Sequence, residues 1–236
     1  MSAVLEAEKV CKAFGGNVAV DAVSLTLAEG EMVALVGPNG AGKTTFLNLL
    51  TGQYLPDSGS VRFDGADVTR LRPSDPARAP VFRSYQGGGT FNKLSALENV
   101  AVAAVARGLS RREAERAATE ALGDVGLGPV AHERAERLSG GQRKLVDFAR
   151  SLVVRPKVAL LDEPTAGVNP VISEVMTRVI RERQSAGMAC LIISHDLAWV
   201  FDLCPWVVAL AAGQLLAKGT PQEVRADPRV VEAYLA

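Results

Sequence analysis

The chain has 236 residues, of which 48% are hydrophobic and 22% are charged. A chain of this length buries roughly 70% of its extended surface on folding, which excludes a disordered or collagen-like protein. Lysine and arginine total 26, and aspartate and glutamate also total 26, so the net charge is zero. From length and composition we expect one globular domain over residues 1–236. Because the chain has no overall positive field to hold nucleic acid, we expect no nucleic-acid partner.

The apolar segments are too short to cross a membrane. The longest, residues 203–212, has ten residues, whereas a spanning helix needs about 20. The N-terminal segment MSAVLEAEKV carries two glutamates where a secretory signal would be basic. Three cysteines, Cys11, Cys190 and Cys204, lack metal-ligand spacing and cannot all pair. We therefore expect a cytoplasmic protein with reduced, buried cysteines.

Four segments have the patterns of β-strands. Residues 23–27 alternate between apolar and polar side chains, which is typical of a half-buried strand. Residues 32–36, 158–161 and 189–193 are short continuous apolar runs, which are typical of strands buried on both faces. Helical patterns separate these runs. The alternation predicts an α/β fold with a mostly parallel sheet and helices on its faces.

The middle of the chain has helix signals instead. Ser95 with Glu98, and Ser110 with Glu113, have the spacing of capping boxes, and no strand pattern lies near them. We therefore expect an α-helical subdomain inserted into the α/β core. The expected division places the core at 1–87 and 133–236 and the helical subdomain at 88–132.

Two later helices have marked ends. Asn169 suits a helix cap, Pro170 suits the first helical position, and Gly187 suits the stop. Thr220 and Glu223 have the spacing of a further capping box. This box predicts a short helix near the end of the chain.

The strongest chemical signal is GPNGAGKT, residues 37–44, between an apolar run and a helical segment at 45–50. In this setting the glycines let backbone N–H groups surround a phosphate. Lys43 supplies positive charge to the outer phosphates, and Thr44 supplies a hydroxyl for magnesium. The alternative is a plain glycine-rich turn, which the strand and helix on either side disfavour. The segment predicts a nucleotide-binding P-loop.

A second signal is the pair Asp162-Glu163 at the end of an apolar run. Two adjacent carboxylates at the end of a buried strand are costly unless one meets a metal and the other a proton or water. In a P-loop enzyme, the aspartate holds Mg²⁺ and a following glutamate polarises the attacking water. A solvated strand end is the alternative, and the P-loop makes it the weaker interpretation.

A third signal is LSGGQ at residues 138–142. Ser139 and Gln142 form a capping box for a helix that we expect to run to residue 154. Glycines at 140 and 141 are poor helix formers, but they leave the N–H groups of the helix end accessible to an anion. The segment therefore predicts a second phosphate-binding helix end in addition to the cap.

Together these motifs resemble the ATP-binding subunits of ABC transporters. The P-loop, LSGGQ at 138–142, LLDEPTAG at 160–167 and His195 occur in that family's order, and the resemblance covers nearly the whole chain. It implies a P-loop NTPase (RecA-like) core with a mostly parallel sheet, an N-terminal antiparallel β portion and the inserted helical subdomain. It also implies ATP hydrolysis, with ATP and Mg²⁺ as cofactors.

The resemblance implies roles for the matching residues. Thr44, Gln86 and Asp162 would hold Mg²⁺. Glu163 would activate the water, helped by Gln86, and His195 would contact the terminal phosphate. The implied nucleotide-binding residues are Phe14, which would stack on adenine, and Gly37, Pro38, Asn39, Gly40, Ala41, Gly42, Lys43, Thr44, Thr45, Ser139 and Gly141.

The resemblance also implies partners. A second cassette, identical or homologous, would pack head to tail, so that Ser139 and Gly141 of one chain touch ATP bound by the other. Segments such as FGG at 14–16 and AGVNP at 166–170 resemble the branched-chain amino-acid importer group, which includes urea and amide relatives. That group implies two transmembrane permeases, a solute-binding protein, and a position on the cytoplasmic face of the membrane.

Three other functions are alternatives. A nucleotide-dependent binding module with little hydrolysis is one, and Glu163 argues against it because the expected general base is present. An exporter or lipid-transport cassette has the same motifs, because the permease sets the direction of transport. A cytoplasmic cassette protein without a permease usually has two cassettes in one chain or long coiled coils, and this sequence has neither. The transported substrate cannot be read from these residues.

Overall fold

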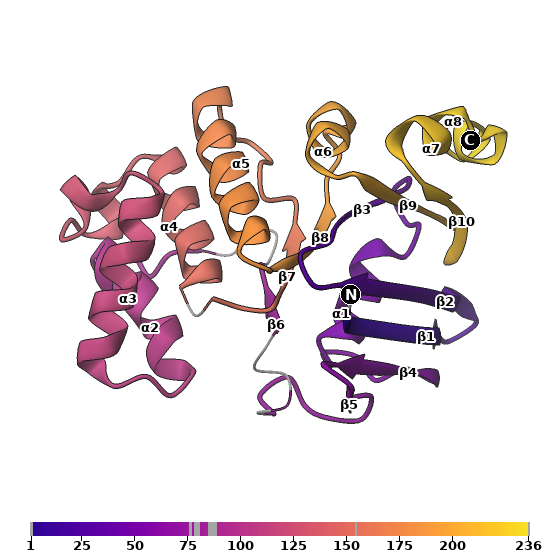
Figure 1. Ribbon diagram of the computed structural model, residues 1–236, viewed down its shortest axis with the longest axis horizontal. Coiled ribbons are helices and arrows are strands. Elements are labelled where there is room, and N and C mark those ends of the chain that lie inside the picture. Colours follow the sequence, from indigo (N-terminus) through magenta and orange to yellow (C-terminus); the bar gives the residue numbers. More distant parts are fainter. Residues whose placement is uncertain (1, 76, 78–80, 85–88, 154, 236) are drawn as a thin grey trace.

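Two β-sheets of different kinds organise the chain (Figure 1). The computed structural model describes residues 2–75, 77, 81–84, 89–153 and 155–235. In this part of the chain, the antiparallel sheet has the order β2-β1-β4-β5, and it consists of β1 (Ala3–Phe14), β2 (Asn17–Ala28), β4 (Ser58–Phe63) and β5 (Ala66–Asp67). The other sheet has the order β10-β9-β3-β8-β7-β6, with β3 (Met32–Val36), β6 (Val81–Arg83), β7 (Val158–Asp162), β8 (Ala189–Ile193), β9 (Trp206–Ala211) and β10 (Gln214–Gly219). Its strands are parallel except for the β9–β10 pair.

The helices lie along one face of the second sheet, apart from α1 (Figure 1). They are α1 (Lys43–Leu50), α2 (Ala96–Ala106), α3 (Arg111–Asp124), α4 (Gly140–Leu152), α5 (Pro170–Ser185), α6 (Leu197–Leu203), α7 (Pro221–Ala226) and α8 (Pro228–Leu235). Two short 3₁₀ turns cover Gly128–Val130 and Ala135–Arg137. No helix in the described ranges is both long and apolar enough to span a membrane.

The central strands bury both of their faces, as their continuous apolar runs predict. In β3, Val33 and Leu35 pack with the apolar side of α1 and the antiparallel sheet, whereas Ala34 and Val36 pack with the layer of helices. Strands β3, β7 and β8 have five residues each, and all of these residues are buried. The fold is therefore two apolar cores on either side of one sheet, and α1 lies inside one of them.

The α/β fold class is confirmed, and so are the local signals. The capping boxes at Ser95, Ser110, Ser139 and Thr220 all form with their predicted partners. Asn169 caps α5 by accepting a hydrogen bond from the Ile172 amide. Helix α4 ends at Leu152, two residues before the expected end, and residue 154 lies outside the described part of the chain.

The expected helical segment contains α2 and α3, but it does not contain every helix of this layer. Helix α4 begins at Gly140, beyond residue 132, and packs against both α2 and α3 through apolar side chains such as Val146 and Ala149. The helical layer therefore uses residues from both sides of the expected boundary. The division at 88–132 stays a prediction.

Cys11 differs from expectation. Cys190 and Cys204 are buried and free, and burial raises the pKa of both thiols. Cys11 is only partly buried, and its sulfur accepts a hydrogen bond from the Ala22 amide at 3.2 Å where β1 and β2 pair irregularly. Strand β1 lies between β2 and β4, and the Cys11 thiol hydrogen-bonds to the β2 backbone instead of joining the apolar cluster of the neighbouring core.

Candidate active site

The loop between β3 and α1 depends on glycine at two positions. At Gly37, with φ of 149°, a Cβ atom would lie 2.1 Å from the Leu210 carbonyl oxygen. At Gly42, with φ of 96°, it would lie 2.3 Å from the Ala19 carbonyl oxygen. Any other residue would force the backbone of β9 or β2 to move. The loop is therefore clamped from two sides, while Gly40 has open space where a Cβ would be.

Lys43 is folded into this loop. Its Nζ donates hydrogen bonds to the carbonyl oxygens of Gly37 at 2.6 Å and Pro38 at 2.9 Å. Burial lowers the pKa of Lys43, and the negative charges of Glu163 and Asp162 oppose that shift. Phosphate oxygens are stronger acceptors for an ammonium group than neutral carbonyls. The lysine is thus held where a phosphate in the loop would attract it.

The two carboxylates at the end of β7 are almost fully buried, with 5% of each residue exposed. The Asp162 amide donates to Ser84 Oγ at 3.0 Å, and the Glu163 amide donates to the Ile193 carbonyl at 3.0 Å. Glu163 has φ of 52°, a left-handed conformation. Such strain costs about 1–3 kcal/mol and persists only where the surroundings impose it. Here Ile193 of β8 holds Glu163 in this conformation, because its carbonyl accepts the hydrogen bond from the Glu163 amide.

His195 contacts Glu163 from the end of β8. The His195 amide donates to Glu163 Oε2 at 3.1 Å, and His195 Nε2 lies 3.4 Å from Glu163 Oε1. Oε1 is buried and accepts no hydrogen bond from the described residues. The imidazole remains 60% exposed. One carboxylate oxygen is therefore held by the His195 amide, and the other lies beside the imidazole without accepting a hydrogen bond from the described residues.

One cleft brings most of the predicted site residues together. Its lining includes the P-loop from Asn39 to Thr45, the two carboxylates at 162 and 163, His195 and Phe14. Gln86 lies outside the described residues. The cleft therefore brings residues that are far apart in sequence together around the P-loop. This arrangement suits the binding of a nucleotide.

The residues of LSGGQ lie elsewhere. Figure 1 shows α4 beyond α5 and β8 from α1, and neither Ser139 nor Gly141 lines the cleft. The Ser139 side chain accepts from the Gln142 amide at 3.2 Å and caps α4. A Cβ at Gly141 would meet Ile172 of α5 at 2.1 Å, whereas one at Gly140 would meet nothing within 4 Å. The atom that a Cβ at Gly141 would meet is the terminal methyl carbon of Ile172, which can move, so packing within this chain does not require glycine at either position.

Phe14 forms the outer wall of the cleft. Its ring is 44% exposed and stands edge-on to Tyr54, with 5.1 Å between ring centroids. Lys12 Nζ lies 5.6 Å from the ring centroid and is held by Asp57 at 2.8 Å. The ring is therefore supported by neighbours while part of it stays open for stacking.

The oxygen atoms in the cleft suit magnesium. Thr44 offers an exposed hydroxyl, and Asp162 offers a carboxylate, in the same cleft as the P-loop. The described residues hold no group of three or more His, Cys, Asp or Glu side chains that could bind a metal by themselves. Magnesium is commonly bound by one or two protein oxygens together with substrate phosphates and water. The donor set fits an ion that arrives with a nucleotide.

Two residues beside the cleft had no role assigned to them from the sequence. Tyr54 supports Phe14, and Arg83 pairs with Asp162 through Nη2 and Oδ2 at 3.2 Å. Both lie in segments that resemble the importer group, at 51–65 and 83–86, but sequence reasoning did not predict their contacts because their partners are distant in the chain. The available signal for Arg83 was its place at the end of a short apolar strand, where a buried charge needs a partner.

Comparison with protein families identifies two matching segments. Residues 20–166 match the family described as "ABC transporter". Residues 214–235 match the family described as "Branched-chain amino acid ATP-binding cassette transporter". The first match covers more than half of the chain and contains the P-loop, LSGGQ and the two carboxylates.

Similar proteins cover nearly the whole chain. The high-affinity branched-chain amino acid transport ATP-binding protein BraF of Pseudomonas aeruginosa is 36% identical, over 98% of this chain and 97% of the relative. The lipopolysaccharide export system ATP-binding protein LptB of Escherichia coli is 35% identical, over 99% of this chain and 97% of the relative. A solved ATP-binding cassette of an ABC transporter in its ADP conformation superimposes with a TM-score of 0.90 at 30% identity, over 100% of both chains.

Proposed function

The chain belongs to the ABC transporter family of ATP-hydrolysing subunits, and from that membership we propose that it powers the uptake of branched-chain amino acids. The observation that carries this proposal is the match of residues 214–235 to the branched-chain cassette family, together with the similarity to BraF over nearly the full length. A second candidate is lipid export, which the similarity to LptB favours. We infer an importer and not an exporter because residues 214–235 match the branched-chain cassette family, in addition to the similarity to BraF over the rest of the chain.

The proposed chemistry uses groups that share one cleft. Lys43 and the loop amides bind the phosphates, and burial of Lys43 keeps water from competing for its ammonium group. Glu163 accepts the proton of the attacking water through Oε1, while His195 fixes the other carboxylate oxygen through its backbone amide. His195 also offers its exposed imidazole to the terminal phosphate.

Thr44, Asp162 and Gln86 would hold magnesium in this proposal. The bound ion would neutralise charge on the phosphates during transfer. Thr44 and Asp162 approach from different elements, the start of α1 and the end of β7. The contribution of the chain is to fix these two oxygens in the cleft before the nucleotide arrives.

The partners that we propose are a second cassette, identical or homologous, and two transmembrane permeases served by a solute-binding protein. The chain would then lie at the cytoplasmic face of the membrane. Phe91 is a candidate permease contact, since it is 52% exposed. The buried Asn99 side chain accepts from the Phe91 amide at 2.7 Å and donates to its carbonyl at 3.1 Å. These two hydrogen bonds fix the backbone at Phe91, so that its exposed apolar side chain stands on a loop of fixed position.

Uptake in cells tests the transport function. Deleting the gene is expected to reduce accumulation of radiolabelled leucine, isoleucine and valine, and the wild-type gene is expected to restore it. A gene carrying Glu163→Gln is the control for hydrolysis and is expected to restore nothing. Unchanged amino-acid uptake, together with loss of a lipid from the cell surface, would contradict the importer and support the lipid-export alternative.

Nucleotide binding tests the role of Phe14. An aromatic face stacks on any base, because it has no hydrogen-bond donor or acceptor that reads one. Phe14→Ala is expected to weaken ATP and GTP binding alike, by about 1–3 kcal/mol, measured by fluorescence titration. Tyr54→Ala is the matched control for support of the ring and is expected to have a smaller effect. A loss confined to ATP would show that Phe14 discriminates the base.

A further inference from the structure

A buried ion pair lies directly behind the cleft. Arg83, the last residue of β6, places Nη2 3.2 Å from Asp162 Oδ2, and their side chains are only 5% and 4% exposed. A carboxylate in such surroundings is costly without a counter-charge. The Arg83 guanidinium supplies that counter-charge.

The same guanidinium reaches a second element. Its Nη1 donates to Asn48 Oδ1 on α1, the helix that follows the P-loop. Ser84, the next residue after β6, accepts the Asp162 amide at Oγ, and its own amide donates to the Leu160 carbonyl at 3.0 Å. Two neighbouring residues therefore fix both the backbone and the side chain of Asp162, and one of them ties it to α1.

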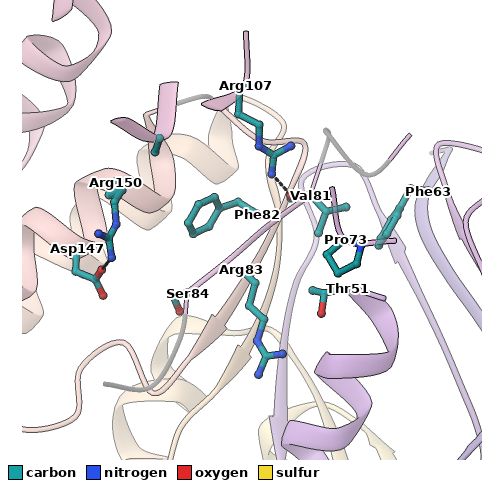
Figure 2. A pocket seen from close by; sticks show the side chains of 11 residues that line it. Thr51, Phe63, Pro73, Val81, Phe82, Arg83, Ser84, Arg107, Asp147 and Arg150 are labelled. Atoms are coloured by element: carbon teal, nitrogen blue, oxygen red, sulfur yellow. Dashed lines mark hydrogen bonds and ion pairs between the residues drawn. The ribbon is translucent and has the colours of Figure 1, made fainter. Parts of the chain in front are cut away.

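Arg107 is a useful contrast on the same strand. Its Nη2 donates to the Val81 carbonyl at 2.8 Å, at the other end of β6. Figure 2 shows the Arg107 side chain reaching the backbone of β6 at Val81, whereas the Arg83 side chain leaves β6 toward α1. Within the described part of the chain, side-chain contacts place Arg83 on Asp162, a proposed magnesium ligand, and Arg107 on the backbone of β6.

We propose that Arg83 is a positioning residue for the magnesium site. It holds the Asp162 carboxylate by one oxygen and thereby keeps the other oriented for the hydration shell of the ion. The planar fork joins Asp162 to Asn48, so the end of β7 and helix α1, which carries Thr44, keep a fixed separation. This inference rests on the proposed role of Asp162 in holding magnesium.

Magnesium titration of nucleotide binding tests the inference without hydrolysis. The probe is a fluorescent, non-hydrolysable ATP analogue, titrated first in EDTA and then with rising Mg²⁺. Arg83→Met is expected to raise the Mg²⁺ concentration for half-maximal binding by about 10–100-fold, the range for loss of a residue that supports a metal ligand. Affinity in EDTA is expected to stay unchanged, because Arg83 does not line the nucleotide cleft.

The remaining variants separate positioning from folding. Arg83→Lys keeps the charge but loses the fork, and Asn48→Ala keeps the ion pair but loses the tie to α1, so both are expected to shift the Mg²⁺ dependence less, in the same direction. Arg107→Met is the matched control and is expected to change nothing. If Arg83→Met does not fold by circular dichroism, Arg83→Lys and Asn48→Ala decide the question.

Asp162→Asn distinguishes the two possible failures. If it shifts the Mg²⁺ dependence and the Arg83 and Asn48 variants do not, Arg83 is only a structural ion pair and the inference is wrong. If Asp162→Asn has no effect either, the proposed magnesium site itself is wrong. Tighter Mg²⁺ dependence in Arg83→Met would show that the arginine competes with the metal, which also overturns the inference.

Discussion

Glu163→Gln is expected to bind ATP with near wild-type affinity and to hydrolyse it at least about a hundredfold more slowly, in the range for loss of a general base. An amide has nearly the same shape as the carboxylate, and its oxygen can still accept the hydrogen bond that the His195 amide donates at 3.1 Å. The geometry of the cleft should therefore survive. What the amide lacks is a basic oxygen in place of Oε1, the buried atom that accepts no hydrogen bond from the described residues.

Two controls give this result a specific meaning. Lys43→Ala is expected to lose ATP binding, because the ammonium group inside the loop is removed. Glu98→Gln changes the same chemical group in the exposed capping box of α2 and is expected to leave turnover unchanged. Binding is measured by nucleotide fluorescence and turnover by phosphate release. Near wild-type turnover in Glu163→Gln would assign the base to another residue.

The elements that could be predicted are those whose signals are local. The runs that became β3, β7 and β8 are apolar throughout because both faces of each strand are buried. Every capping box formed, because its two hydrogen bonds join residues only three apart. Strand β1 was not predicted, since irregular pairing with β2 and a left-handed Lys9 interrupt its alternation. Strand β6 has only three residues, too few for a pattern to show.

The candidate site divides in the same way. The P-loop and the carboxylates at 162 and 163 could be predicted because the residues that form each of them are consecutive in the sequence. Arg83 does not, because its partner is 79 positions away and no spacing rule links them. The position of Ser139 relative to the P-loop also depends on tertiary structure, and the cleft excludes it within one chain.

Ser139→Arg is expected to abolish ATP-dependent association of two cassettes while each chain still binds nucleotide. In a single chain the P-loop cleft contains no residue of LSGGQ, yet Ser139 is exposed at the start of α4 and Gly140 has open space around it. In the head-to-tail pairing that we propose, these groups contact the terminal phosphate bound by the partner. The much longer arginine side chain would overfill the space between the two closely packed chains, at a cost of about 1–3 kcal/mol and occasionally more. Association would weaken by about a hundredfold at the upper end of that range.

The measurement is sedimentation velocity in the Glu163→Gln background, which keeps ATP intact. With ATP, the chain is expected to sediment as a dimer, or as a complex with its homologous cassette if the natural pair is mixed. With ADP, it is expected to sediment as a monomer, because the terminal phosphate that joins the two chains is missing.

Ser110→Arg is the matched control for Ser139→Arg. Ser110 is likewise an exposed cap, with the same box geometry at the start of α3. Loss of either cap costs about 1 kcal/mol of stability, so the two variants are destabilised alike. Only the change at Ser139 removes a group that we place between two chains. Equal association in both variants, or a monomer that ignores ATP with its correct partner present, would reduce Ser139 to the cap of α4.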